Sequence, residues 1–152
     1  MPAQLPVILL TGATGFVGSH LLKTLTVIGY RVIIILRNNS STARISSFLG
    51  SVIVYNIDHV PLDSVFKENP IDIVIHLATH YGRKGESISA IAQTNLIFGL
   101  NLLDEALAHG VSLFINTDTF YHQGSVISEH LQTYSLSKKN NSSSGYIAAK
   151  AK

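Results

Sequence analysis

The stretch that decides the fold lies near the start of the chain and reads Val7-Ile8-Leu9-Leu10-Thr11-Gly12-Ala13-Thr14-Gly15-Phe16-Val17-Gly18. Its first four residues are apolar without alternation, which is typical of a parallel strand covered on both faces. After the glycines, apolar residues recur at helical spacing as far as Gly29, a residue type that suits a helix end. The stretch therefore predicts a strand over residues 7–10, a tight turn, and a helix over residues 16–28.

The glycine turn has the features of a diphosphate site. Glycine carries no Cβ, so Gly12, Gly15 and Gly18 allow a tight turn and a close approach of a ligand to the backbone. The positive end of the following helix dipole points at the same place, where Phe16 and Val17 offer their amides. Because the turn joins a predicted strand to a predicted helix, it predicts a dinucleotide site; the alternative is a purely structural turn.

Strands and helices alternate along the rest of the chain. Continuous apolar runs predict strands, and apolar residues three and four apart predict helices. This alternation implies right-handed crossovers and an α/β fold, a doubly wound, Rossmann-like parallel sheet of about five strands. Further strands are expected over residues 31–36, 52–55, 71–77 and 112–116, and further helices over residues 62–67 and 87–109.

The composition indicates one well-buried domain, since 46% of the 152 residues are hydrophobic and 13% are charged. A net charge of +2 without a basic run gives no support for a nucleic-acid partner, and the absence of cysteine excludes thiolate metal sites. We also expect no metal site at His76 and His80, which lie at a strand end and its loop. Neither a signal-peptide pattern nor a membrane-spanning apolar run is present, so we expect a cytoplasmic protein without a membrane partner.

The second predicted strand ends at a residue that indicates which dinucleotide binds. A carboxylate at this place would bind the ribose hydroxyls and repel a 2′-phosphate, but the chain has Arg37 there, with Arg44 close by. A guanidinium favours a 2′-phosphate through charge-assisted hydrogen bonds. We therefore expect NADP(H), with NAD as second choice; the alternative is that Arg37 is an exposed loop residue.

The glycine spacing after the first strand resembles that of the extended short-chain dehydrogenase/reductases, the NAD-dependent epimerase/dehydratase family. The resemblance implies that Thr11 and the three glycines bind the cofactor. It also implies that Asp58, or Asn56 in its place, binds the adenine amino group, and that Leu77 and Ala78 line the nicotinamide ribose. Members of this family act on nucleotide-linked sugars.

Reduction of a ketone requires a proton donor, and a nearby lysine can shift the pKa of a phenol toward working pH. A tyrosine precedes a lysine by one helical turn twice, as Tyr134 and Lys138 and as Tyr146 and Lys150. The first pair follows the run Asn116-Thr117-Asp118-Thr119, and together they look like the nucleotide-sugar reductases of the paratose/abequose-synthase type. This resemblance implies a helix with Tyr134 as acid/base and Lys138 as ribose ligand.

Two supporting residues are also implied by the resemblance. Thr117, with Thr119 as the alternative, would hydrogen-bond the substrate carbonyl, and Asn95, with Asn101 as the alternative, would position the catalytic lysine. The expected function is NADP(H)-dependent 4-keto reduction of a nucleotide-linked sugar. The alternatives are an epimerase or dehydratase of such a sugar and a catalytically inactive dinucleotide-binding fragment or sensor.

The chain changes character near its end. Residues 138–145 are polar and rich in asparagine and serine, a composition seen in linkers and frayed ends. We therefore expect a dinucleotide-binding domain over residues 1–139 and a polar tail over residues 140–152, whose composition is typical of disordered segments. Extended family members have further strands and a substrate-binding C-terminal lobe, which we expect to be missing through truncation. The uncovered sheet edge would then favour a homo-oligomer.

Overall fold

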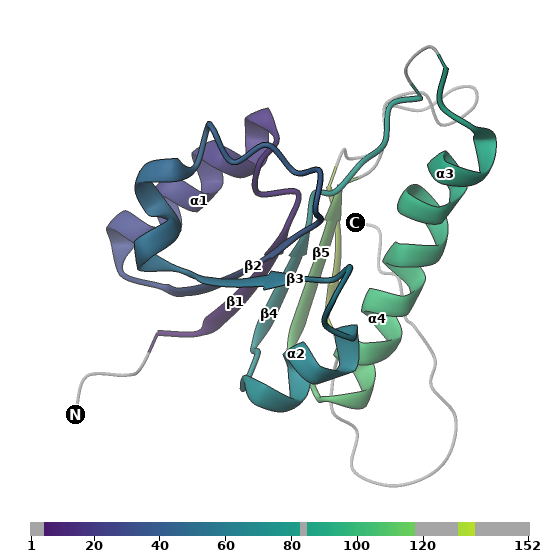
Figure 1. The fold of residues 1–152 in the computed structure, drawn as a ribbon. Coiled ribbons are helices and arrows are strands. Elements are labelled where there is room, and N and C mark those ends of the chain that lie inside the picture. Colours follow the sequence, from purple (N-terminus) through teal and green to yellow (C-terminus); the bar gives the residue numbers. More distant parts are fainter. Residues whose placement is uncertain (1–4, 83–84, 118–130, 136–152) are drawn as a thin grey trace, which may run out of the picture.

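The computed structural model of the chain describes residues 5–82, 85–117 and 131–135, which alternate strands and helices (Figure 1). The strands are β1 (Val7–Thr11), β2 (Arg31–Leu36), β3 (Ile53–Asn56), β4 (Ile73–His76), β5 (Leu113–Thr117) and β6 (Leu131–Ser135). The helices are α1 (Phe16–Ile28), α2 (Leu62–Glu68), α3 (Ile88–Ala92) and α4 (Phe98–Ala108), with a 3₁₀ segment η1 (Ser46–Ser51) and a π segment η2 (Gln93–Ile97).

The strands form one sheet in the order β3-β2-β1-β4-β5-β6. Strands β1 to β5 are parallel, which confirms the predicted doubly wound, Rossmann-like sheet. The chain builds outward from β1 through β2 to β3 and then returns to place β4 on the other side of β1. This reversal makes the carboxyl ends of β1 and β4 the place where such sheets bind ligands.

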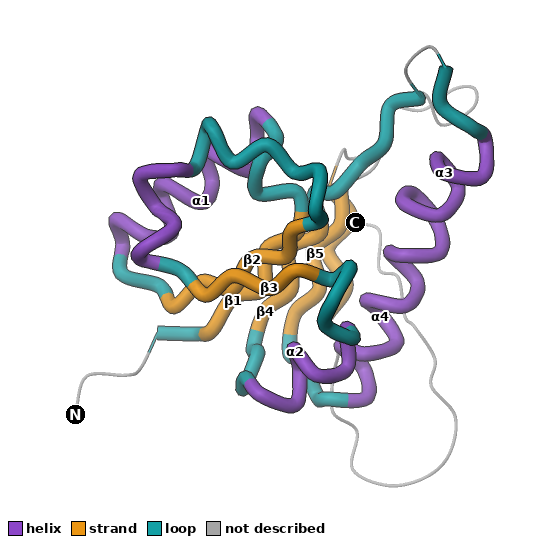
Figure 2. The backbone as a smooth tube through the Cα atoms, in the orientation of Figure 1, coloured by secondary structure: helices purple, strands orange, loops and turns teal. Residues whose placement is uncertain are grey.

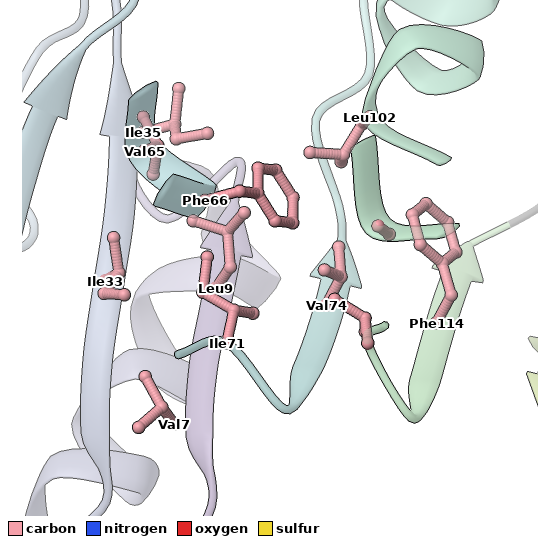
Figure 3. Packing of buried hydrophobic residues seen from close by; sticks show 12 residues of the cluster. Val7, Leu9, Ile33, Ile35, Val65, Phe66, Ile71, Val74, Leu102 and Phe114 are labelled. Carbon is pink, nitrogen blue, oxygen red and sulfur yellow. The ribbon is translucent and has the colours of Figure 1, made fainter. Parts of the chain in front are cut away.

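Helices cover both faces of the sheet and form two apolar cores (Figure 2). Successive strand residues point to opposite faces, so Leu9 belongs to one core and Leu10 to the other. Leu22 of α1 packs in the same core as Leu10. Phe66 of α2 and Leu102 of α4 pack in the core of Leu9, which Figure 3 shows from close by.

The long helix predicted over residues 87–109 is present but not uniform. The hydroxyl of Ser87 caps its start by accepting a hydrogen bond from the Ala90 amide. Between α3 and α4 the backbone widens into the π segment η2, a feature that is rare and often found at functional sites. Asn95 lies within this segment.

The helix that was expected to carry Tyr134 is absent, because residues Leu131–Ser135 form β6 instead. This strand runs antiparallel to β5, with Tyr134 opposite Phe114. The backbone pairing along β5 gives this segment the hydrogen bonds that a helix would have supplied internally. Lys138 and the tail predicted over residues 140–152 lie outside the described residues.

Candidate dinucleotide-binding site

The glycine turn follows β1 at the point where the strand order reverses. Gly12 has a φ of 70°, a conformation that favours glycine, and its carbonyl accepts a 3.0 Å hydrogen bond from the amide of Gly15. Helix α1 then begins at Phe16, as predicted. The turn therefore directs the amino end of α1 toward the carboxyl edge of the sheet.

Two of the glycines are required by the packing of the turn itself. A Cβ on Gly12 would lie 2.6 Å from the backbone carbonyl carbon of Leu77, and one on Gly18 would lie 2.1 Å from the carbonyl oxygen of Gly12. Gly12 thus lets the segment after β4 lie against the turn, and Gly18 lets α1 pack on it. A Cβ on Gly15 would meet only the Gly12 oxygen, at 3.2 Å.

The outer side of the turn is open at the start of α1. Gly15 occupies the N-cap position and has no side chain to bond the first-turn amides, and no acidic residue stands in that turn. The side chains of Phe16 and Val17 point outward, with 72% and 63% of their surface exposed. The uncapped amides and the helix dipole can therefore bind an anion such as a diphosphate.

Thr11 supports the site from inside the protein. Its side chain is buried, its hydroxyl lies 2.7 Å from Nδ1 of His76, and it accepts a 3.3 Å hydrogen bond from the amide of Ala78. Burial lowers the pKa of His76 to about 4, so the imidazole is neutral near pH 7. The Thr11 hydroxyl thus engages one of the two ring nitrogens of His76. The structure therefore places Thr11 behind the turn, where it fixes Leu77 and Ala78.

Asn95 holds the loop that continues from Ala78. Its side-chain Oδ1 accepts from the amide of His80 at 2.7 Å, and its Nδ2 donates to the carbonyl of His80 at 2.9 Å. Both polar ends of the amide are thus engaged by one residue of the loop. Asn101 lies elsewhere, beside a hollow on the α2 and α4 face, so the structure brings Asn95 and not Asn101 to the β4 end.

The carboxyl ends of β2 and β3 meet beside the turn, at the place predicted to select the cofactor. Arg37 is exposed at the end of β2, where its backbone forms a turn with Ser40. Arg44 donates to the carbonyl of Thr14 at 3.4 Å, which places a second guanidinium against the glycine turn. The site therefore has two cations near the predicted ribose position.

Asp58 belongs to a polar network that joins the loops after β2 and β3. Its carboxylate accepts a 2.7 Å hydrogen bond from the amide of Asn38, and the Asn38 side chain accepts from Asn56 at 2.7 Å and lies 2.9 Å from His59. Asn38 and His59 were not among the site residues predicted from the sequence. The sequence could have predicted them, because they follow two adjacent parallel strands and the carboxyl ends of such strands meet at one edge of a sheet.

Thr117, like Asn95, belongs to the predicted catalytic set, and the structure describes its side chain near the β4 end. Its hydroxyl donates to the carbonyl of His76 at 3.4 Å, across the β4 and β5 pair. Tyr134 is placed only by its backbone in β6. Thr119, Lys138 and the alternative pair Tyr146 and Lys150 lie outside the described residues.

The fold and the open glycine turn define a Rossmann-like protein of the dinucleotide-binding type. Residues 8–152 match the NAD dependent epimerase/dehydratase family. The chain belongs to this family, which confirms the resemblance drawn from the glycine motif. In the described residues, no helix is both long and apolar enough to cross a membrane.

The chain is also similar in sequence to enzymes whose names contain a nucleotide-linked sugar. The chain is 34% identical over 149 residues to the CDP-abequose synthase of Salmonella typhimurium, covering 93% of this chain and 48% of that protein. It is 31% identical over 133 residues to the CDP-abequose synthase of Salmonella muenchen, covering 88% and 44%. The chain thus spans about half the length of the curated relatives it matches.

Solved structures share the fold. A UDP-glucose 4-epimerase from Thermotoga maritima, solved with UDP-glucose, matches with a TM-score of 0.64 and 26% identity, over 81% of this chain and 42% of that one. The enzyme WbmG of Bordetella bronchiseptica, solved with NAD, matches with a TM-score of 0.70 and 22% identity, over 84% and 43%. Because the identity of the second match is only 22%, this match supports the fold and nothing further.

Proposed function

We propose that this chain binds NADP(H) and forms the cofactor-binding part of an enzyme that reduces the 4-keto group of a nucleotide-linked sugar. The observation that carries the proposal is the uncapped start of α1 behind Gly15, which offers backbone amides to a diphosphate. The identity to two CDP-abequose synthases supports a nucleotide-linked sugar as the substrate class.

The preference for NADP(H) rests on charge at the end of β2. Arg37 stands where a carboxylate would select NAD, and Arg44 adds a second guanidinium at Thr14. The nearby carboxylate of Asp58 is already bonded to the Asn38 amide. A 2′-phosphate at this position would gain charge-assisted hydrogen bonds that NAD cannot form.

The proposed reaction assigns a role to each residue of the catalytic set. Bound NADPH would supply the hydride to the carbonyl carbon. Tyr134 would donate its phenolic proton to the oxygen, Lys138 would lower the pKa of that phenol and bind the ribose, and Thr117 would hydrogen-bond the carbonyl. Asn95 would act as a positioning residue through the His80 loop.

A second candidate, dinucleotide binding without turnover, is favoured by the strand at Leu131–Ser135. In a helix, a tyrosine and a lysine four residues apart are neighbours, but Tyr134 lies in a strand. Catalysis by Tyr134 and Lys138 as a helical pair would require this segment to leave its pairing with β5. The two candidates share the cofactor site and differ only in whether the chain turns substrate over.

The cofactor site is tested by calorimetric titration with NADPH and NADH, using Gly15→Ala and Gly50→Ala as a matched pair. The added methyl of Gly15→Ala would occupy the face where the diphosphate approaches, and we expect binding to weaken at least tenfold (about 1.4 kcal/mol). Gly50 has open space around its Cβ position, so Gly50→Ala should bind as the parent does. Equal binding by both variants would exclude the glycine turn as the site.

Cofactor choice and turnover are tested separately. Arg37→Ser should reduce the preference for NADPH over NADH, while Lys23→Gln, which removes an exposed cation of α1, should leave it unchanged. Oxidation of NADPH by a nucleotide-linked 4-keto sugar, lost in Tyr134→Phe, would support the reductase. NADPH binding without oxidation would support the second candidate, and a preference for NADH would contradict the assignment of Arg37.

A further inference from the structure

Three side chains with metal-binding atoms converge between α2 and α4, on the face of the sheet opposite α1. Asp63 lies in the first turn of α2, and Glu105 and His109 lie one helical turn apart at the end of α4. The Nε2 atom of His109 is 3.4 Å from Oδ1 of Asp63 and 3.5 Å from Oε2 of Glu105. All three candidate ligand atoms lie within 4.8 Å of one another.

These separations fit a single small cation. Zinc binds histidine nitrogen and carboxylate oxygen at about 2.0–2.2 Å, so the corners of its tetrahedral coordination sphere lie about 3.4 Å apart. The two distances from His109 already have this value. Only a modest side-chain adjustment is needed to bring the two carboxylate oxygens to the same spacing.

The packing beneath the cluster holds the ligands in place. Phe66, which is buried between α2 and α4, stacks on the imidazole of His109 with ring centroids 5.5 Å apart. The amide of His109 donates to the carbonyl of Glu105, which keeps these two residues on adjacent turns. The two helices are therefore fixed by the core, and the ligand set does not depend on a mobile loop.

The charges and space around the cluster are compatible with a bound ion. Lys67 bonds Oδ2 of Asp63 at 2.6 Å, and the other carboxylate oxygen, Oδ1, faces His109. Beside Asp63 and Glu105 lies an open hollow of about 410 Å³, which can hold water at the remaining coordination positions. Asp104 and Asn101 also line it.

We propose that Asp63, Glu105 and His109 bind one divalent transition-metal ion, with zinc as the best-fitting ion, and that the ion joins α2 to α4. The imidazole ligand selects this class of metal over magnesium and calcium, which prefer a larger set of oxygen ligands. With three protein ligands from two helices, the ion would stabilise the folded state over the unfolded chain. This site is separate from the glycine turn and does not depend on the proposed cofactor.

The test is a calorimetric titration of the metal-free chain with ZnCl₂, alongside the variants His109→Gln, Glu105→Gln and His20→Gln. The parent chain should bind one zinc ion per chain, and loss of either ligand should weaken binding at least tenfold. His20→Gln is the matched control, because it removes an exposed imidazole on α1 that is not one of the three ligands. It should bind zinc as the parent chain does.

Thermal unfolding supplies an independent readout. Zinc should raise the melting temperature of the parent chain and of His20→Gln but not of His109→Gln, and MgCl₂ should raise none of them. Melting of the metal-free variants confirms that each is folded, and Asp63→Asn replaces either variant that is not. The chain has seven histidines. Zinc binding that survives both ligand variants, magnesium binding of equal strength, or no zinc binding at all would each overturn the proposal.

Discussion

The hydroxyl of Thr11 connects three parts of the site that are distant in sequence. It lies at the end of β1, 2.7 Å from the His76 ring of β4, and it accepts a hydrogen bond from the Ala78 amide of the following loop. None of the buried side-chain polar atoms in the described part of the chain lacks a partner. This buried hydroxyl is therefore one of the contacts that hold the loop after β4 against the glycine turn, together with the close approach of Leu77 to Gly12.

Thr11→Val keeps the shape of this side chain and removes its hydrogen bonds. Because Nδ1 of His76 and the Ala78 amide would lose their partner, we expect the free energy of unfolding to fall by about 1–3 kcal/mol. Urea denaturation measures this loss. Thr24→Val is the control, because Thr24 is exposed on α1, and it should change stability by no more than about 0.5 kcal/mol. Equal losses in the two variants would show that the Thr11 hydroxyl contributes nothing specific.

His76 should make stability depend on pH. Its pKa is about 4 in the folded chain and 6.5 as a free side chain, so between these values the unfolded chain binds more protons than the folded one. Stability should therefore fall as the pH is lowered from 6.5 through about 4, by up to ~3 kcal/mol from this residue.

The measurement compares chemical denaturation at several pH values for the parent chain and His76→Gln. The pH dependence of stability between about 4 and 6.5 should be flatter in the variant, because glutamine does not titrate. His20→Gln, which removes an exposed imidazole on α1, should keep the slope of the parent chain. Parallel curves for the parent chain and His76→Gln would contradict a buried neutral imidazole.

Among the helices and strands, those whose bounds depend on neighbouring residues were predicted correctly from the sequence. Helix α1 and strand β2 have the predicted bounds. The glycine turn precedes α1, Gly29 in the left-handed conformation ends it, and a continuous apolar run forms β2, so each signal lies next to the element that it predicts. The glycine turn itself was found in the same way. The polar network of Asn38 and His59 was not predicted, because it forms only when the sheet brings the ends of β2 and β3 together.

The elements that the sequence analysis missed depend on distant partners. Strand β6 has the sequence Leu-Gln-Thr-Tyr-Ser, which is no continuous apolar run, and its pairing with β5 crosses a gap in sequence. Strand formation depends strongly on such partners. The spacing of Tyr134 and Lys138 is that of one helical turn, and the family resemblance implies a helix there, but the structure has a strand over Leu131–Ser135. Glu105 and His109 are four residues apart, a spacing that places both side chains on one face of a helix, but no metal site was predicted there.

The π segment η2 places Asn95 against the loop after β4, and Asn95→Ala tests this contact. Both side-chain hydrogen bonds to the His80 backbone would be lost, so hydrogen exchange at the His80 amide should become faster. The bonds are exposed, so global stability should fall by only about 1 kcal/mol. Asn101→Ala, on the neighbouring α4, should leave exchange at His80 unchanged. Unchanged exchange in Asn95→Ala would show that the loop is held by other contacts.

At the scale of the whole molecule, the sheet joins two apolar cores into one folding unit. Neighbouring residues of β1 supply both cores, since Leu9 packs with α2 and α4 and Leu10 packs with α1. A loss of order on one face therefore disturbs the strand that supports the other face. The glycine turn lies at the carboxyl end of β1, and the cluster at α2 and α4 lies on the face of the sheet opposite α1.

Leu22→Ala and Leu102→Ala test this coupling from opposite faces. Both side chains are fully buried, and each truncation should lower the free energy of unfolding by about 2–5 kcal/mol. Because the two cores share β1, each variant should unfold in one transition, with circular dichroism and tyrosine fluorescence giving the same midpoint. Leu107→Ala is the control on α4, since this side chain is 46% exposed and should contribute much less. Separate midpoints for the two probes in either core variant would mean that the faces unfold independently, and the sheet would then not transmit a change at α2 and α4 to the glycine turn.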